Sequence, residues 1–168
     1  MAAALKRTGS RTARKQAKQK AKPMDAIRLL KEDHREVEKY FKQYEDLESD
    51  REKQALAQTI CKALSVHAQI EEEIFYPAAR EKIEDEDLLD EAEVEHASAK
   101  DLIAQIQSMK VGDDLFDAKV KVLGEYIQHH VKEEEGEMFP EARDADLDLV
   151  ALGKALAERK AKLMAAKA

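Results

Sequence analysis

Four histidines and two glutamates recur in this sequence at spacings that suit a shared metal site. Glu71 follows His67 by four residues, and Glu134 follows His130 by four residues. Residues four apart lie one above the other on a helix, so each pair would point an imidazole and a carboxylate the same way. Carboxylates buried among helices are costly unless a cation compensates their charge. The candidate metal ligands are His34, His67, Glu71, His96, His130 and Glu134.

The pattern occurs twice, in the same order in each half of the chain. His34 precedes His67 by 33 residues, and His96 precedes His130 by 34. Two helix pairs related by a pseudo-twofold axis would therefore bring the four imidazoles and both carboxylates together. The matched spacing selects His130 rather than His129, which lies roughly 100° away around a helix. We expect His129 to be exposed or to support the site from outside.

Apolar residues recur at three- and four-residue steps around the histidines, as they do on one face of a helix. Pro77 and Pro140 each follow one of the glutamates by six residues, and we expect each to end its helix. Asp113 or Asp114 is expected to cap the fourth helix. Short links between the helices favour an up-down-up-down bundle. The predicted helices cover about 24–47, 51–76, 85–109 and 113–138.

The composition agrees with an all-α domain. Of 168 residues, 39% are charged and 5% are aromatic, while five Gly and three Pro are too few for a protein made of many tight turns. No apolar run approaches the roughly 18 residues of a membrane span. No early apolar stretch resembles a secretory signal, and Cys61 alone cannot form an internal disulfide. These features predict a cytoplasmic protein without a membrane span.

Charge divides the chain into unequal parts. Residues 1–23 hold eight Lys or Arg and no acid, so this tail carries +8 and the remainder −15. We expect the tail to be disordered, since it buries too little apolar surface to offset its ordering entropy. A solubilising role is one reading of the tail, and contact with nucleic acid or an acidic partner is another.

A fifth amphipathic stretch follows the predicted bundle. We assign 24–142 to the bundle and 143–168 to a C-terminal helix that either packs on its own bundle or binds a second subunit. The leucines that would form its apolar face are Leu149, Leu152, Leu156 and Leu163.

The ligand pattern, together with Tyr76-Pro77 and Phe139-Pro140, resembles the hemerythrin-like, or HHE cation-binding, domain over about 25–142. The resemblance implies a four-helix bundle in which two glutamates bridge two iron ions and four histidines complete the protein ligands. A bridging oxo, hydroxo or water group is also implied. Imidazole and carboxylate donors suit manganese and zinc as well.

This sequence departs from the oxygen-carrying hemerythrins at two positions. Lys100 stands where those proteins have a further histidine, and Glu134 stands where they have an aspartate. The resemblance is therefore to a four-histidine, two-glutamate branch in which both metals have an open position. Members of that branch are associated with catalase-like peroxide breakdown, sensing of oxygen or iron, and iron delivery or repair.

Three functions remain open at this point. The first, which we favour, is a di-iron protein that binds or reacts with O2, peroxide or nitric oxide, as in protection from oxidative stress. The second is an iron-handling or sensing module, and the third is an interaction protein in which the metal is structural and the tail binds nucleic acid. Tyr126, four residues before His130, is a candidate for a phenol that reaches the site, although a packing role is the plainer alternative.

Overall fold

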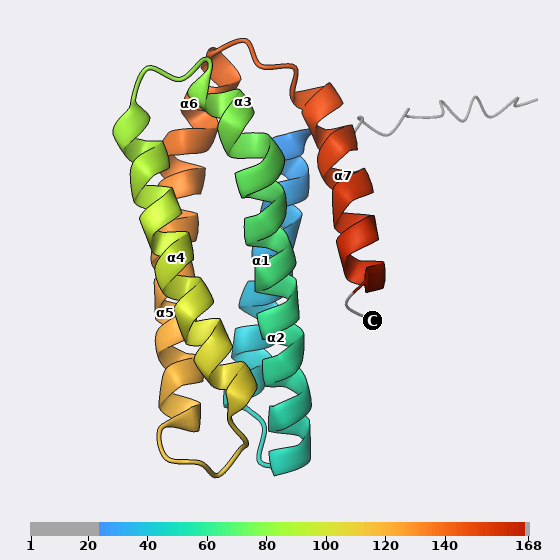
Figure 1. The fold of residues 1–168 in the computed structure, drawn as a ribbon, viewed down its shortest axis with the longest axis vertical. Helices are drawn as coiled ribbons and strands as arrows, with labels where there is room; N and C mark the ends of the chain where they lie inside the picture. Colours follow the sequence, from blue (N-terminus) through green and yellow to red (C-terminus); the bar gives the residue numbers. More distant parts are fainter. Residues whose placement is uncertain (1–23, 167–168) are drawn as a thin grey trace, which may run out of the picture.

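The computed structural model describes residues 24–166, and the expectations for tail 1–23 and for 167–168 lie outside the described residues. The described part is helical without strands, and its four long helices run alternately up and down (Figure 1). This confirms the predicted all-α bundle with an extra C-terminal helix. The four long helices are α1 (Ala26–Glu45), α2 (Asp50–Ile70), α4 (Glu86–Ser108) and α5 (Phe116–Glu133).

The second and fourth helices do not end at their prolines, so that prediction is wrong. Each continues through a π-helical turn into a short α-helix that contains the proline near its start. In the first case the Tyr76 N–H donates to the carbonyl of Glu71, five residues back. One extra residue per turn shifts the backbone register, and the proline then lies where its missing N–H is tolerated. The segments are η1 (Glu71–Phe75) with α3 (Tyr76–Arg80), and η2 (Glu134–Met138) with α6 (Phe139–Asp144).

The start of α5 also differs from the prediction. The helix begins at Phe116, after Leu115 in the left-handed backbone region with φ 71°. Asp113 does not cap this helix, because its carboxylate accepts the N–H of Lys110 in the preceding loop.

The candidate ligands form a layer between two apolar clusters. On α1, Leu30 belongs to one cluster and Val37 to the other, with His34 between them. On α2, Ile70 and Leu64 flank His67 in the same way. Apolar packing on both sides therefore holds the polar layer in place and limits its access to water.

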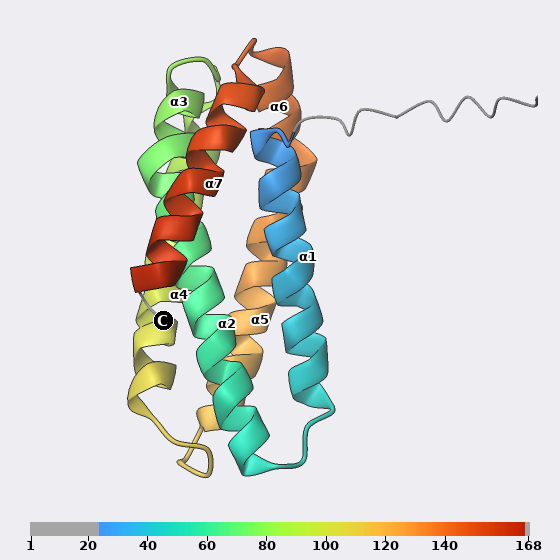
Figure 2. The ribbon, with the colours of Figure 1, turned by 90° about the vertical axis from the view of Figure 1, so that its right-hand side faces the viewer.

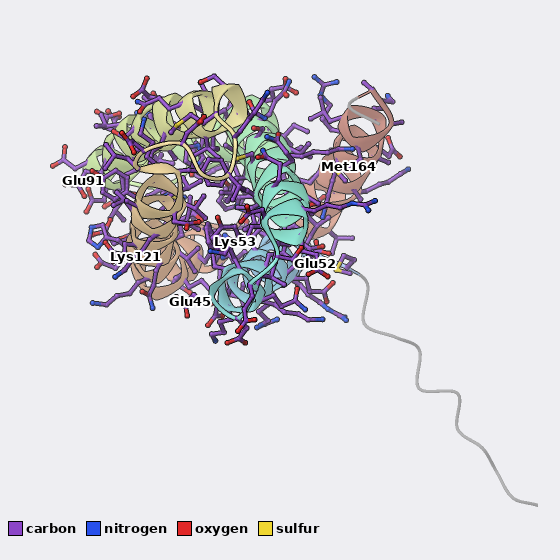
Figure 3. All side chains as sticks on the ribbon, turned by 90° about the horizontal axis from the view of Figure 1, so that it is seen from below. Glu45, Glu52, Lys53, Glu91, Lys121 and Met164 are labelled. Carbon is purple, nitrogen blue, oxygen red and sulfur yellow. The ribbon has the colours of Figure 1, made fainter. Side chains whose placement is uncertain are left out.

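The fifth helix, α7 (Leu149–Ala166), packs outside the bundle against α1, α2 and η1 (Figures 1 and 2). Gly153 permits this approach, because a Cβ there would lie 2.7 Å from the backbone N of Ala26. Viewed from below, α7 lies outside the group formed by the four long helices (Figure 3). The structure thus places this helix on its own bundle, the first of the two alternatives.

No helix within residues 24–166 combines the length and apolar character needed to cross a membrane.

Candidate metal centre

The structure brings all six predicted side chains into one buried cluster. The Nε2 atoms of His34 and His67 lie 3.1 Å apart, and those of His96 and His130 also lie 3.1 Å apart. All four imidazoles and both carboxylates are at least nine-tenths buried. Their donor atoms fall into two overlapping groups that share Glu71, namely His34, His67, Glu71 and Glu134, and Glu71, His96 and His130.

Each glutamate contacts one histidine from each half of the chain. Glu71 Oε2 lies 3.2 Å from His67 Nε2 and 3.5 Å from His96 Nε2. Glu134 Oε2 lies 3.5 Å from His130 Nε2 and 3.3 Å from His34 Nε2. Both glutamates are the first residues of their π-helical turns. The arrangement suits carboxylates that bridge two cations.

A carboxylate outside the cluster lies beside the outward nitrogen of each histidine, and for three of the four the two atoms are hydrogen-bonded. Because a carboxylate only accepts, the Nδ1 atom in each short pair carries the proton, which leaves the Nε2 lone pair facing the centre. Such carboxylate support is typical of histidines that bind metals. The pairs are His34–Glu135 at 3.0 Å, His96–Glu72 at 3.0 Å, His130–Glu95 at 2.7 Å and the longer His67–Asp33 at 3.5 Å.

Three of these four outer carboxylates are neutralised by a lysine. Glu135 pairs with Lys31 of α1, and Glu72 pairs with Lys100 of α4. Asp33 pairs with Lys160, which extends from α7 across to α1. Lys100 therefore takes no place in the cluster, but it supports the carboxylate that orients His96.

The cluster has the unmet bonding capacity expected of a cation site. In the described part of the chain, both oxygens of Glu71 and the Oε2 of Glu134 are buried and have no hydrogen-bond partner. Inward-facing lone pairs on neighbouring imidazoles would also repel one another without a proton or a metal between them. The donor set of four imidazoles and two carboxylates thus fits two transition-metal ions.

The electrostatics of the metal-free cluster agree with this fit. Burial alone would lower the pKa of His67, but Glu71, Asp33 and Glu134 outweigh it and raise the pKa to about 10. For His130, burial is likewise outweighed by Glu134 and Glu95, and the pKa rises to about 8. The buried carboxylates attract positive charge, and protons occupy positions that a cation would take.

A small cavity adjoins the imidazoles. It has a volume of about 20 Å³ and is lined by all four histidines but by neither glutamate. The rest of its wall is mainly aliphatic and includes Val37, Leu64, Ala99 and Ile103. A space of this size holds a water-sized molecule.

A tyrosine touches the cluster, but it is not the predicted one. Tyr126 is 50% exposed and lines a surface recess together with His96 and His130. Tyr76 is buried, donates from its hydroxyl to Glu134 Oε1 at 2.9 Å and lies 3.2 Å from His96 Nε2. Phe139 occupies the matching position in the second half and stacks on His34 with ring centroids 5.9 Å apart.

Sequence reasoning also missed the outer carboxylates. Helical period places Glu72 and Glu135 away from the buried face, yet each reaches a histidine of the other half. The sequence contains two signs of these carboxylates. Glu72 and Glu135 each directly follow a candidate ligand. Asp33 and Glu95 directly precede the candidate ligands of their own helices. The repeat thus contains these four acids as well as the six candidates.

Comparison with known proteins identifies the domain. The family model "Hemerythrin HHE cation binding domain" matches residues 25–142. The chain belongs to the hemerythrin HHE family. Membership implies that this HHE domain binds metal cations, in agreement with its donor set. A crystal structure of an HHE cation binding domain-containing protein from Mycobacterium kansasii has the same fold, with a TM-score of 0.72, 22% identity, and coverage of 84% of this chain and 88% of that one.

A relative from Nostoc sp. (strain PCC 7120) has a name of a different kind. This protein, named "DNA nickase", is 29% identical to the HHE chain over 136 residues. The match covers 81% of this chain and 38% of the relative. The HHE chain thus spans well under half the length of that relative.

Proposed function

We propose that this HHE protein holds two iron ions and uses them to bind and react with a small oxidant such as O2 or peroxide. His34, His67, His96 and His130 would be the nitrogen ligands, and Glu71 and Glu134 the bridging oxygen ligands. Iron in this position supplies redox electrons and open coordination positions. The chain supplies the ligands, their orientation and the exclusion of bulk water.

The observation that carries this proposal is the cavity beside the four imidazoles. Its volume of about 20 Å³ admits a ligand of two or three atoms at most. Its aliphatic wall favours a small, weakly polar molecule over a charged metabolite. The cavity is lined by the four histidines and by neither glutamate, so a small ligand there would lie beside the imidazoles.

The chain's own residues would control protons and orientation at this site. The Tyr76 hydroxyl donates a hydrogen bond to Glu134 and stays protonated, because burial and the nearby carboxylates hold the pKa of this phenol well above 10. Glu72, Glu95 and Glu135 hold the Nδ1 protons of His96, His130 and His34 and so fix the donor nitrogen of each ring.

The test combines metal analysis with a variant that fills the cavity. Full-length protein purified without oxygen or added metal should contain about two irons per chain, and its absorbance should change on addition of peroxide and recover as peroxide is consumed. Ala99→Val places two methyl groups at the cavity wall and should slow this reaction while iron content is kept. Ala104→Val on the exposed face of the same helix is the matched control.

Each outcome has a distinct reading. Absence of iron, or a single zinc, would overturn the di-iron assignment. Two irons without peroxide consumption would favour sensing or iron handling over oxidant chemistry. Equal rates for Ala99→Val and Ala104→Val would remove the role of the cavity.

A second candidate function is contact with nucleic acid through residues 1–23. The charge of +8 in this tail and the similarity to a protein named "DNA nickase" support it. Binding of this kind weakens steeply with salt because phosphate contacts release counterions. Full-length protein should then bind duplex DNA at low salt, and replacement of the eight basic residues by glutamine should abolish the binding.

A further inference from the structure

A second group of metal-ligating side chains lies at the surface between α4 and α5. His129 Nε2 is 3.1 Å from Glu133 Oε1 and 3.5 Å from Glu95 Oε1. One donor atom from each of the three residues lies within 4.8 Å of the others. His129 is exposed, with 63% of its side chain accessible, so an ion held here would exchange with solvent.

The charge at this group differs from that at the other outer carboxylates. Asp33, Glu72 and Glu135 are each paired with a lysine. Within residues 24–166, Glu95 and Glu133 form ion pairs with imidazoles only, and with no lysine or arginine. Two carboxylates thus share one exposed imidazole, in a place where the other three supports each have a lysine.

The group also lies beside a route toward the buried cluster. A recess of about 180 Å³ between α4 and α5 is lined by His129 and Glu95 and also by His96 and His130. Glu95 belongs to both places, since Oε1 faces His129 while Oε2 accepts from His130 Nδ1 at 2.7 Å. An ion at the surface group would be one carboxylate away from a ligand of the buried cluster.

We propose that Glu95, His129 and Glu133 form a separate site for one divalent transition-metal ion, which holds the ion before it enters the buried centre. One imidazole and two carboxylates suit Fe²⁺, Mn²⁺, Co²⁺ and Zn²⁺. Three ligands leave positions for water, and such a site releases its ion readily. The bound ion takes the place that a lysine has at the other three outer carboxylates. The entry role rests on the proposed metal centre, whereas the surface site itself does not.

The first test counts ions at equilibrium. Iron-loaded full-length protein is dialysed against Co²⁺, and iron and cobalt are measured separately so that exchange at the centre is seen. Wild type should bind one cobalt per chain in addition to its iron. His129→Ala and Glu133→Gln should lose that cobalt, and the exposed neighbours Gln128→Ala and Glu125→Gln on the same helix should keep it.

The second test measures loading. Metal-free protein is mixed with Fe²⁺ under anaerobic conditions, and the iron that a colour-forming chelator no longer reaches is followed in time. His129→Ala and Glu133→Gln should load about tenfold more slowly or worse, the range seen when groups supporting a metal site are removed. The final iron content should match that of Gln128→Ala.

The outcomes separate the two proposals. No additional cobalt in wild type, or cobalt retained in His129→Ala, would overturn the surface site. Normal loading rates, or a lower final iron content in His129→Ala and Glu133→Gln, would overturn its entry role. A chain that takes up no iron at all but still loses surface cobalt in His129→Ala would contradict the proposed centre and leave the surface site standing.

Discussion

The α1–α2 half and the α4–α5 half of the bundle present matching side chains to the centre but have different surroundings. In the first half, α7 lies against the helices (Figure 2). Lys160 of α7 pairs with Asp33, the carboxylate behind His67. In the second half, a surface recess reaches His96 and His130, and His129 contacts the equivalent carboxylate, Glu95. The same kinds of side chain are therefore covered by a helix in the first half and lie beside an open recess in the second half.

The difference also reaches the cluster itself. Tyr76 of the first half donates to Glu134, whereas Phe139 in the same place of the second half donates nothing to Glu71. Duplicated ligands thus need not produce two equal metal positions. A hydrogen bond, a lysine and a covering helix would distinguish the two metal positions of the proposed centre, although their ligands are of the same kinds.

Removing a candidate ligand should have the largest effect and should affect both halves alike. We expect His67→Ala and His130→Ala each to lose at least one iron per chain. The free energy of unfolding should fall by about 3–4 kcal/mol, the linkage expected for a ligand present at 100 to 1,000 times its dissociation constant. Iron analysis and denaturant unfolding with and without a chelator check this, with Gln128→Ala as control. Two irons retained in either variant would contradict the shared centre.

The support from α7 should matter next, and only to the first half. Lys160→Met leaves the buried Asp33 without its lysine and loosens the support of His67. We expect metal affinity to fall about 10–100-fold, as is usual for outer partners of ligating histidines. Competition with a chelator of known affinity measures the change. Lys154→Met on the exposed side of α7 is the control, and equal affinities for the two variants would show that α7 serves packing alone.

The hydrogen bond from Tyr76 should have an effect of similar size, and we expect that it can be transferred from one half to the other. Tyr76→Phe removes a buried hydrogen bond to a carboxylate and should lower the free energy of unfolding of the metal-free protein by about 1.5–3 kcal/mol. Phe139→Tyr offers a hydroxyl to the other half, where Glu71 lacks a partner. The double variant should therefore recover much of the loss in denaturant titrations. No recovery would mean that the two halves differ in backbone placement as well as in this residue.

The repeat in the sequence predicts the bundle and the clustering of the six candidates, because helical period and spacing both act locally. It does not predict the path of the chain at Pro77 and Pro140, since helical period does not reveal the π-helical turn that precedes each proline. Helical period alone does not predict the roles of Glu72 and Glu135, because it cannot show that a neighbouring helix brings a histidine to them. Tyr76 was read only as part of a helix end, and its role depends on contacts across the bundle.

The far end of the bundle joins the two halves and should show the smallest effect. Asp117 of α5 accepts from the Tyr44 hydroxyl of α1 at 2.6 Å and from Lys53 of α2, which Figure 3 labels at this end. The hydrogen bond from Tyr44, and then Lys53, hold the pKa of Asp117 below 3.8, despite some burial. Its contribution to stability is therefore present above the unfolded pKa and is lost as the pH falls through the lower folded value.

Asp117→Asn should accordingly cost less than about 1 kcal/mol near neutral pH, since the carboxylate is mostly exposed. The difference from wild type should shrink as the pH falls below 3.8. Unfolding curves across this pH range measure it, with the exposed Asp114→Asn as control. Metal content should be unchanged, because Asp117 lies in the first turn of α5, away from the ligand layer. A loss of iron in this variant would mean that the junction of the two halves, and not only their ligands, sets the geometry of the centre.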